Sequence, residues 1–169
     1  HKCPPFLAGS ETIAREIVED RPDTSRIYVP IGGGGLLSAI CAAAESSSTE
    51  IEVLGVEAEQ APAFARSFQA GRPVAIAEMD TIADALTINE PDGEVFDYVA
   101  SRTSRIVTVS EEEIVNAMRS LFDEFRVIAE PGGAASLAAM VKSDDGKNAA
   151  AIISGGNVSL DEFLQITGS

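Results

Sequence analysis

Four consecutive glycines, Gly32–Gly35, form the stretch of this sequence best suited to binding a ligand. An apolar run, 27–31, precedes them and a run of small and apolar residues, 36–44, follows, which predicts a strand before the glycines and a helix after them. Such a junction leaves backbone N–H groups uncovered, next to the positive end of a helix. We therefore predict a phosphate-binding loop here; a flexible surface turn is the alternative.

Two further glycine turns, Glu130–Gly133 and Ser154–Asn157, stand at other junctions between predicted strands and helices. In parallel α/β sheets, ligands bind outside the carboxyl ends of the strands. Three glycine turns of this kind predict one shared site with a closely approaching backbone.

Composition excludes several classes of protein. The 169 residues carry a formal net charge of -15, which argues against nucleic acid and anionic membranes as partners. The acidity fits a high-salt cytoplasm or an ordinary acidic protein. No apolar run is long enough to span a membrane and no signal-peptide pattern opens the chain, so we expect a cytoplasmic protein.

The sequence offers few side chains for acid–base or metal chemistry. Its two cysteines, Cys3 and Cys41, make neither a disulfide framework nor a metal-type spacing. The one histidine, His1, excludes catalytic triads and histidine-rich zinc sites. Any difficult chemical step must therefore come from a cofactor or from residues elsewhere.

Strand and helix patterns alternate along the chain, which predicts a single α/β domain over residues 1–169 with a parallel twisted sheet and helices on both faces. Segment 73–96 has no clear pattern apart from a loop at 89–93. The predicted strands are 27–31, 51–57, 105–109 and 148–153. Three predicted helices begin at Leu36, Pro62 and Ala134, and another has Ser10 as its cap. Two more begin with capping boxes, Ser110/Glu113 and Ser159/Glu162. The helix that starts at Ser110 is predicted to place Phe122 and Phe125 in the core.

One interpretation of the first turn is a dinucleotide fold. Gly33-x-Gly35-x-x-Ser38 approximates its fingerprint, and Glu57 ends the next strand where a ribose-binding acid would lie. This interpretation leaves the other two glycine turns unexplained. A nucleoside-triphosphate loop is excluded because Gly-Lys-Ser/Thr is absent.

Taken together, the motifs resemble the pyridoxal-phosphate enzymes of the threonine/serine dehydratase and serine racemase family, the fold type II enzymes that include the tryptophan synthase β chain. The resemblance runs in order from about residue 7 to 158. It is carried by Val29-Pro30-Ile31-Gly32-Gly33-Gly34-Gly35-Leu36, Gly55-Val56-Glu57, Ala83-Asp84-Ala85-Leu86, Glu130-Pro131-Gly132-Gly133-Ala134 and Ser154-Gly155-Gly156-Asn157-Val158.

The resemblance implies a role for each matching residue. Ser154 would hydrogen-bond the pyridine nitrogen, Ala85 and Gly155 would lie beside the cofactor, and Glu130 would lie near it and tune proton transfer. Glu130 could instead be an acid favoured by the helix that follows it. The phosphate would be held by the backbone of Gly32, Gly33, Gly34, Gly35 and Leu36.

Three departures from the family pattern stand out. Ala85 replaces a glycine beside the cofactor, and Ser10-Glu11 replaces Gln-Gly before the first helix. Racemase-like members bind a cation near the residue that matches Glu57, but Ala63 stands about where a second acid belongs. Glu57 is therefore a candidate metal ligand without a matching site.

The resemblance also implies what this chain lacks. The family's Ser-x-Lys segment, which carries the Schiff-base lysine, and its Ser-x-Gly-Asn substrate loop have no match here. We therefore expect this chain to be the carboxyl-terminal part of the family's large domain. Without the small domain and the lysine, the chain is expected to be inactive by itself. The parent protein is expected to be a homo-oligomeric threonine or serine dehydratase, as in isoleucine biosynthesis, with a small hydroxy amino acid as substrate. A racemase, or a non-catalytic dinucleotide-binding module, is the alternative.

Overall fold

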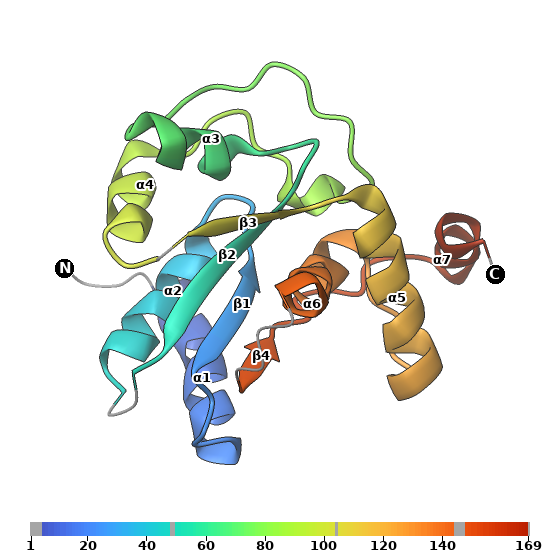
Figure 1. Cartoon of the computed structure of the whole chain (residues 1–169), viewed down its shortest axis with the longest axis horizontal. Coiled ribbons are helices and arrows are strands. Elements are labelled where there is room, and N and C mark those ends of the chain that lie inside the picture. Colours follow the sequence, from blue (N-terminus) through green and yellow to red (C-terminus); the bar gives the residue numbers. More distant parts are fainter. Residues whose placement is uncertain (1–4, 48–49, 104, 144–147, 169) are drawn as a thin grey trace.

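The computed structural model describes residues 5–47, 50–103, 105–143 and 148–168, and its centre is a four-stranded parallel sheet (Figure 1). The strand order is β3-β2-β1-β4. Every strand pair is parallel, which confirms the predicted fold class. The strands are β1 (Arg26–Pro30), β2 (Glu52–Ala58), β3 (Ile106–Val109) and β4 (Ala149–Ala151).

Helices cover both faces of this sheet. In Figure 1, α5, α6 and α7 lie on one side of the strands, while α1 and α2 lie on the other. A parallel sheet needs such cover because its strands are apolar on both sides. The helices are α1 (Pro5–Asp20), α2 (Gly35–Glu45), α3 (Ala63–Ala70), α4 (Gly93–Ala100), α5 (Glu111–Phe125), α6 (Pro131–Ser143) and α7 (Leu160–Thr167), with a short 3-10 helix, η1 (Asp84–Leu86).

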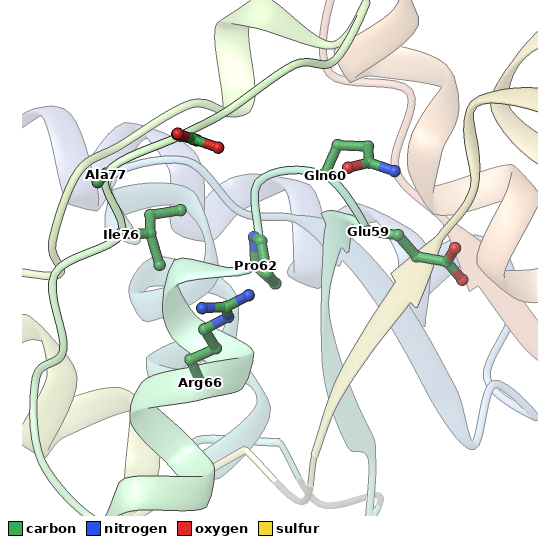
Figure 2. A pocket seen from close by; sticks show the side chains of 7 residues that line it. Glu59, Gln60, Pro62, Arg66, Ile76 and Ala77 are labelled. Atoms are coloured by element: carbon green, nitrogen blue, oxygen red, sulfur yellow. The ribbon is translucent and has the colours of Figure 1, made fainter.

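The turn between β2 and α3 stands at the carboxyl edge of the sheet. Figure 2 shows Glu59, Gln60 and Pro62 in this turn, with Arg66 further along α3. Glu59 N–H donates to the carbonyl of Val109, 2.8 Å away, which ties the turn to the end of β3. The β2–α3 turn and the end of β3 therefore share one edge.

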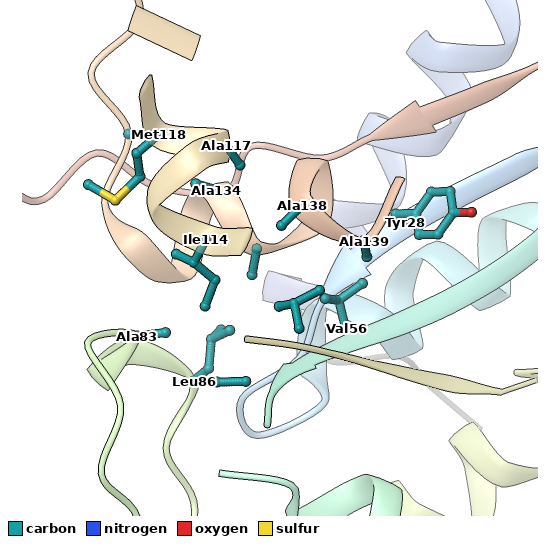
Figure 3. Close-up of a cluster of buried hydrophobic side chains, with 14 of the residues drawn as sticks. Tyr28, Val56, Ala83, Leu86, Ile114, Ala117, Met118, Ala134, Ala138 and Ala139 are labelled. Carbon is teal, nitrogen blue, oxygen red and sulfur yellow. The ribbon is translucent and has the colours of Figure 1, made fainter. Parts of the chain in front are cut away.

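The two sides of the sheet have separate apolar cores. On β1, Tyr28 belongs to the core beneath α5 and α6, whereas Ile27 and Val29 belong to the core beneath α1 and α2. This alternation follows from the two-residue period of a strand. Figure 3 shows Ile114 and Ala138 within the first core, between α5 and α6.

Several predictions about the helices need correction, and the helix predicted from Ala134 begins at Pro131. Helix α1 begins at Pro5, so Ser10 lies inside the helix and is not its cap. Helix α4 was not predicted; Asp92 caps it by accepting hydrogen bonds from the N–H groups of Glu94 and Val95. Phe125 is not in the core. It is the last residue of α5 and 66% exposed, because the buried stripe of that helix ends at Leu121.

Phe122 was also predicted in the core, but 36% of it is exposed. Its ring packs instead against Phe163 of α7, with 5.6 Å between ring centroids. The Ser110/Glu113 capping box is confirmed, since both reciprocal bonds form. At α7 the Ser159 side chain accepts from the Glu162 N–H, which is the serine half of the predicted box.

None of the helices in the described ranges combines the length and apolarity that a membrane crossing would need.

Replacing Ser110 by alanine should lower the free energy of unfolding by about 1 kcal/mol, because the Glu113 N–H at the start of α5 loses its acceptor. Chemical denaturation measures the change. Ser120→Ala, a serine-to-alanine change inside the same helix, should leave stability unchanged or slightly higher. Equal losses in the two variants would show that the cap contributes nothing.

Candidate functional site

The loop Gly32–Gly34 connects β1 to α2 at the carboxyl edge of the sheet. Gly34 caps α2 in a left-handed conformation with φ of 86°. Its carbonyl accepts from both the backbone N–H (2.9 Å) and the hydroxyl (2.8 Å) of Ser38. A Cβ atom on Gly34 would lie only 2.6 Å from Cγ1 of Val95, so this position needs glycine both for its conformation and for its packing.

The N–H groups of this loop are available to a ligand. Among the described residues, none accepts a hydrogen bond from the N–H of Gly32, Gly33 or Gly34. Gly33 is exposed, and a Cβ there would meet nothing within 4 Å. Gly35 and Leu36 open α2, where first-turn N–H groups lack partners within the helix. This donor set is what a phosphate group requires.

The second predicted segment packs against the first. A Cβ on Gly32 would lie 3.0 Å from the carbonyl oxygen of Ala85, in η1. On the other side of η1, a Cβ on Gly132 would lie 3.3 Å from Cγ of Leu86. Ala85 and Leu86 therefore pack between two glycines, with the Ala85 carbonyl facing Gly32 and their side chains facing Gly132. Ala85 is exposed next to the Gly32–Gly34 loop.

The segments Glu130–Gly133 and Ser154–Asn157 lie in close contact. The first was predicted as a turn, but Pro131–Gly133 form the first turn of α6, which follows α5 rather than a strand. A Cβ on Gly133 would overlap the carbonyl oxygen of Gly155, and a Cβ on Gly155 would overlap Oε1 of Glu130. The backbone contact requires glycine at position 133, whereas at position 155 the Glu130 side chain would have to move. The N–H of Glu130 also donates to the Gly155 carbonyl, at 3.2 Å. Gly132 and Gly133 were not among the predicted site residues, although their position directly after Glu130-Pro131 was a usable signal.

The two polar candidates behave differently. The Glu130 carboxylate accepts from the Asn157 N–H at 3.2 Å, so it joins the two turns. Ser154 is exposed, and no described residue bonds its hydroxyl. Ser154 therefore offers a hydroxyl to a ligand, whereas half-buried Glu130 has a structural role in holding the turn beside that hydroxyl.

Glu57 lies apart from these turns and is fully buried at the end of β2. Its two carboxylate oxygens accept from the N–H groups of Phe64 and Ala65, each at 2.8 Å. Burial raises the pKa of Glu57 to about 7, although these two hydrogen bonds oppose the shift. Among described residues, no group of three or more side chains could hold a metal ion, and Ala63, close to Glu57 in sequence, is itself buried.

A pocket of about 360 Å³ lies beside the first turn of α3 (Figure 2). Pro62 and Ile76 line it together with the exposed side chains of Glu59, Arg66 and Glu78. None of the three glycine turns contributes to it. The pocket is therefore distinct from the glycine site.

The comparison with protein families identifies the cofactor. The family model described as "Pyridoxal-phosphate dependent enzyme" matches residues 1–155. The chain belongs to this family. Its cofactor is pyridoxal phosphate, and the unpaired N–H groups of Gly32 and Gly33 and the open Ser154 hydroxyl fit that group.

Two relatives carry names from one reaction class. The chain is 38% identical to the L-threonine ammonia-lyase of Thermotoga maritima, over 96% of this chain and 41% of that protein. It is 36% identical to the L-threonine dehydratase catabolic TdcB of Escherichia coli, over 98% of this chain and 52% of that protein. The chain thus spans about half the length of the relatives it matches.

Solved structures agree with the fold. A threonine deaminase from T.th. superposes with a TM-score of 0.85 and 33% identity, over 91% of this chain and 57% of that one. Maize serine racemase gives a TM-score of 0.85 and 31% identity, over 94% and 52%. The family membership favours pyridoxal phosphate over a dinucleotide, and Ser38 is buried against Gly34 rather than open to a ligand.

Replacing Gly133 by alanine should destabilise the protein by about 1 to 3 kcal/mol, because the new methyl group would overlap the Gly155 carbonyl. Thermal or chemical unfolding measures the loss. Gly9→Ala is the matched control, since Gly9 is also helical but has open space around it, and there alanine should stabilise by about 0.5 to 1 kcal/mol. The two substitutions should change the free energy of unfolding in opposite directions. An increase in stability in both variants would contradict the close contact between Gly133 and Gly155.

The free energy of unfolding should fall as the pH rises from about 4.5 to about 7, because the unfolded chain releases the Glu57 proton before the folded protein does. The total change is about 3 kcal/mol, and above pH 7 this contribution is constant. Denaturation curves at several pH values measure it. Glu57→Gln should flatten this slope, and an unchanged slope in that variant would assign the effect to other groups.

Proposed function

We propose that the protein containing this chain is a pyridoxal-phosphate-dependent lyase that removes the β-hydroxyl of threonine or serine and releases a 2-oxo acid and ammonia. The observation that carries the proposal is the set of N–H groups at Gly32 and Gly33 that have no partner among the described residues, linked through η1 and the start of α6 to the turn that carries the exposed Ser154 hydroxyl. The names of the Thermotoga maritima and Escherichia coli relatives support the choice of reaction.

Each part of the site has one task in this proposal. The N–H groups of the glycine loop and of the first turn of α2 hold the cofactor phosphate. The Ser154 hydroxyl hydrogen-bonds the pyridine nitrogen. The bound cofactor supplies an electron sink for the α-carbon of the amino acid. Glu130 keeps the Ser154–Asn157 turn in place through its bond with the Asn157 N–H, and Ala85 borders the cofactor.

The type of residue at position 154 bears on the reaction. A hydroxyl cannot keep the pyridine nitrogen protonated as firmly as a carboxylate would. The electron sink is then milder, which suits rapid loss of a β-hydroxyl better than storage of a negative charge. Ser154 thus favours elimination.

The lysine that binds the cofactor covalently lies, in this proposal, in a part of the protein outside this chain, together with the small domain. Lys142 is unsuited to that role because its Nζ contacts Glu113 at 3.0 Å and Glu59 at 3.4 Å. Its hydrogen bond to Glu113 raises the pKa of Lys142 and keeps the amine protonated. Lys2 and Lys147 lie outside the described residues. On this proposal the chain alone is inactive.

An amino-acid racemase is the second candidate, favoured by the likeness to maize serine racemase. Loss of the α-proton is common to both reactions. The Glu57 carboxylate is occupied by two backbone N–H groups and has no acidic neighbour at Ala63, which favours the lyase over a cation-dependent racemase.

Finer features belong to the proposal as well. We propose that the protein binds neither nucleic acid nor anionic membrane, on the basis of its acidic composition. The family resemblance supports a homo-oligomer, and we propose that it works in the cytoplasm. The name of the Escherichia coli relative favours a catabolic role over isoleucine biosynthesis.

The full-length protein with pyridoxal phosphate should show a visible absorbance band that changes when threonine is added, with release of 2-oxobutanoate. Ser154→Ala should retain cofactor and lose activity by about ten- to a hundredfold, the effect of one hydrogen bond worth about 1.5 to 3 kcal/mol.

Ser159→Ala is the matched control, since Ser159 caps α7 and should leave turnover unchanged. Absence of the band, together with tight binding of NAD, would reject the lyase and support the dinucleotide module. Conversion of L-serine to D-serine without 2-oxo acid would support the racemase.

A further inference from the structure

The buried carboxyl of Glu57 takes no part in the proposed chemistry. It is fully buried, and burial of an ionisable group is unfavourable unless hydrogen bonds compensate for the lost water. Both of its oxygens receive such bonds, from the N–H groups of Phe64 and Ala65 at 2.8 Å. These are first-turn N–H groups of α3, so the carboxyl fastens the start of α3 to the end of β2.

Helix α3 in turn presents a large ring to the phosphate-binding loop. Phe64 is fully buried, and its Cζ lies 3.0 Å from where a Cβ on Gly34 would stand. Val95 of α4 touches the same point from another direction, at 2.6 Å. Gly34 therefore lies in a narrow space between the side chains of Phe64 and Val95. Its backbone is left-handed there, with φ of 86°.

The opposite side of Gly34 is fixed by α2. Its carbonyl accepts two hydrogen bonds from Ser38, so the residue is held between α2 and the Phe64 ring. The neighbouring N–H groups of Gly32 and Gly33 have no partners of their own among the described residues. On the strand side, the Ile31 N–H donates to the Val56 carbonyl at 2.8 Å and fixes the start of the loop. On the helix side, the direction of the Gly32 and Gly33 N–H groups depends on how firmly Gly34 is held.

We propose that Glu57 is a positioning residue for the phosphate-binding loop, acting through the two N–H groups of α3 and the Phe64 ring on Gly34. Loss of the carboxylate frees the start of α3 and loosens the packing around Gly34. The loop amides then spend less time in the arrangement that binds phosphate. The identity of the phosphate as that of the cofactor rests on the proposed function; the ordering of the loop does not.

The first test is the dissociation constant of pyridoxal phosphate for the full-length protein. Glu57→Gln supplies one acceptor in place of two, and its NH2 group would face a backbone N–H. We expect about tenfold weaker binding and a shifted phosphorus resonance of the bound cofactor, equivalent to about 1.4 kcal/mol. Glu113→Gln is the matched control, because Glu113 also accepts from an N–H at a helix start, that of Ser110. It should lower stability without changing affinity or resonance.

The second test needs no cofactor. Hydrogen exchange of the Ser38 amide, which donates to the Gly34 carbonyl at 2.9 Å, should be about tenfold faster in Glu57→Gln than in the wild type or in Glu113→Gln. Phe64→Leu should give a similar increase while leaving the bonds to Glu57 in place. The double variant should be no worse than Phe64→Leu alone, because both changes break one chain of contacts.

The outcomes separate the two proposals. If the wild type binds pyridoxal phosphate but Glu57→Gln changes neither affinity nor exchange, the positioning role is wrong and the proposed function stands. If the wild type binds no pyridoxal phosphate, the proposed function is wrong, and the exchange experiment still decides whether Glu57 orders the loop. Additive effects in the double variant would overturn the path through Phe64.

Discussion

The close approach of backbone to backbone at the carboxyl edge of the sheet is the constraint on which the geometry of the site depends. The Gly155 carbonyl lies where a side chain on Gly133 would stand, and the Ala85 carbonyl lies against Gly32. A single methyl group at Gly133 would separate segments that are distant in the sequence. The contacts bring the three glycine turns and η1 into one cradle, which no individual turn could form.

The sheet makes this convergence possible. Because all four strands are parallel, the Gly32–Gly34 loop after β1 and the Ser154–Asn157 turn after β4 leave the sheet at one edge. The start of α6, which follows α5, packs against η1 and against Gly155 there. Glycine also serves inside the sheet, since a Cβ on Gly55 would lie 2.9 Å from Cδ2 of Leu37, the residue that seats α2 against the strands. The packing of α2 on the strands therefore also fixes the position of the loop that precedes α2.

Some polar side chains around the cradle are exposed and could bind a ligand, whereas others form hydrogen bonds within the protein. The Ser154 hydroxyl has no partner among the described residues, whereas Glu130 and Glu57 use their carboxylates to accept from backbone N–H groups. Glu130 and Glu57 were candidates for chemistry because they are acidic. In the structure, both stabilise the backbone instead. The distinction matters for mechanism, because only a group open to the ligand can act on it.

Local patterns were sufficient to predict the alternation of strands and helices, the glycine loop and the family, because periodicity and glycine spacing are properties of short segments. Helix α4 escaped prediction although Asp92 and the apolar positions after it were a usable signal, and Phe125 was misplaced because burial at a helix end depends on which neighbours reach it. The bonds of Glu57 to α3 and the contact of Phe64 with Gly34 emerge only in three dimensions. Such contacts join segments through space, and no spacing along the chain encodes them.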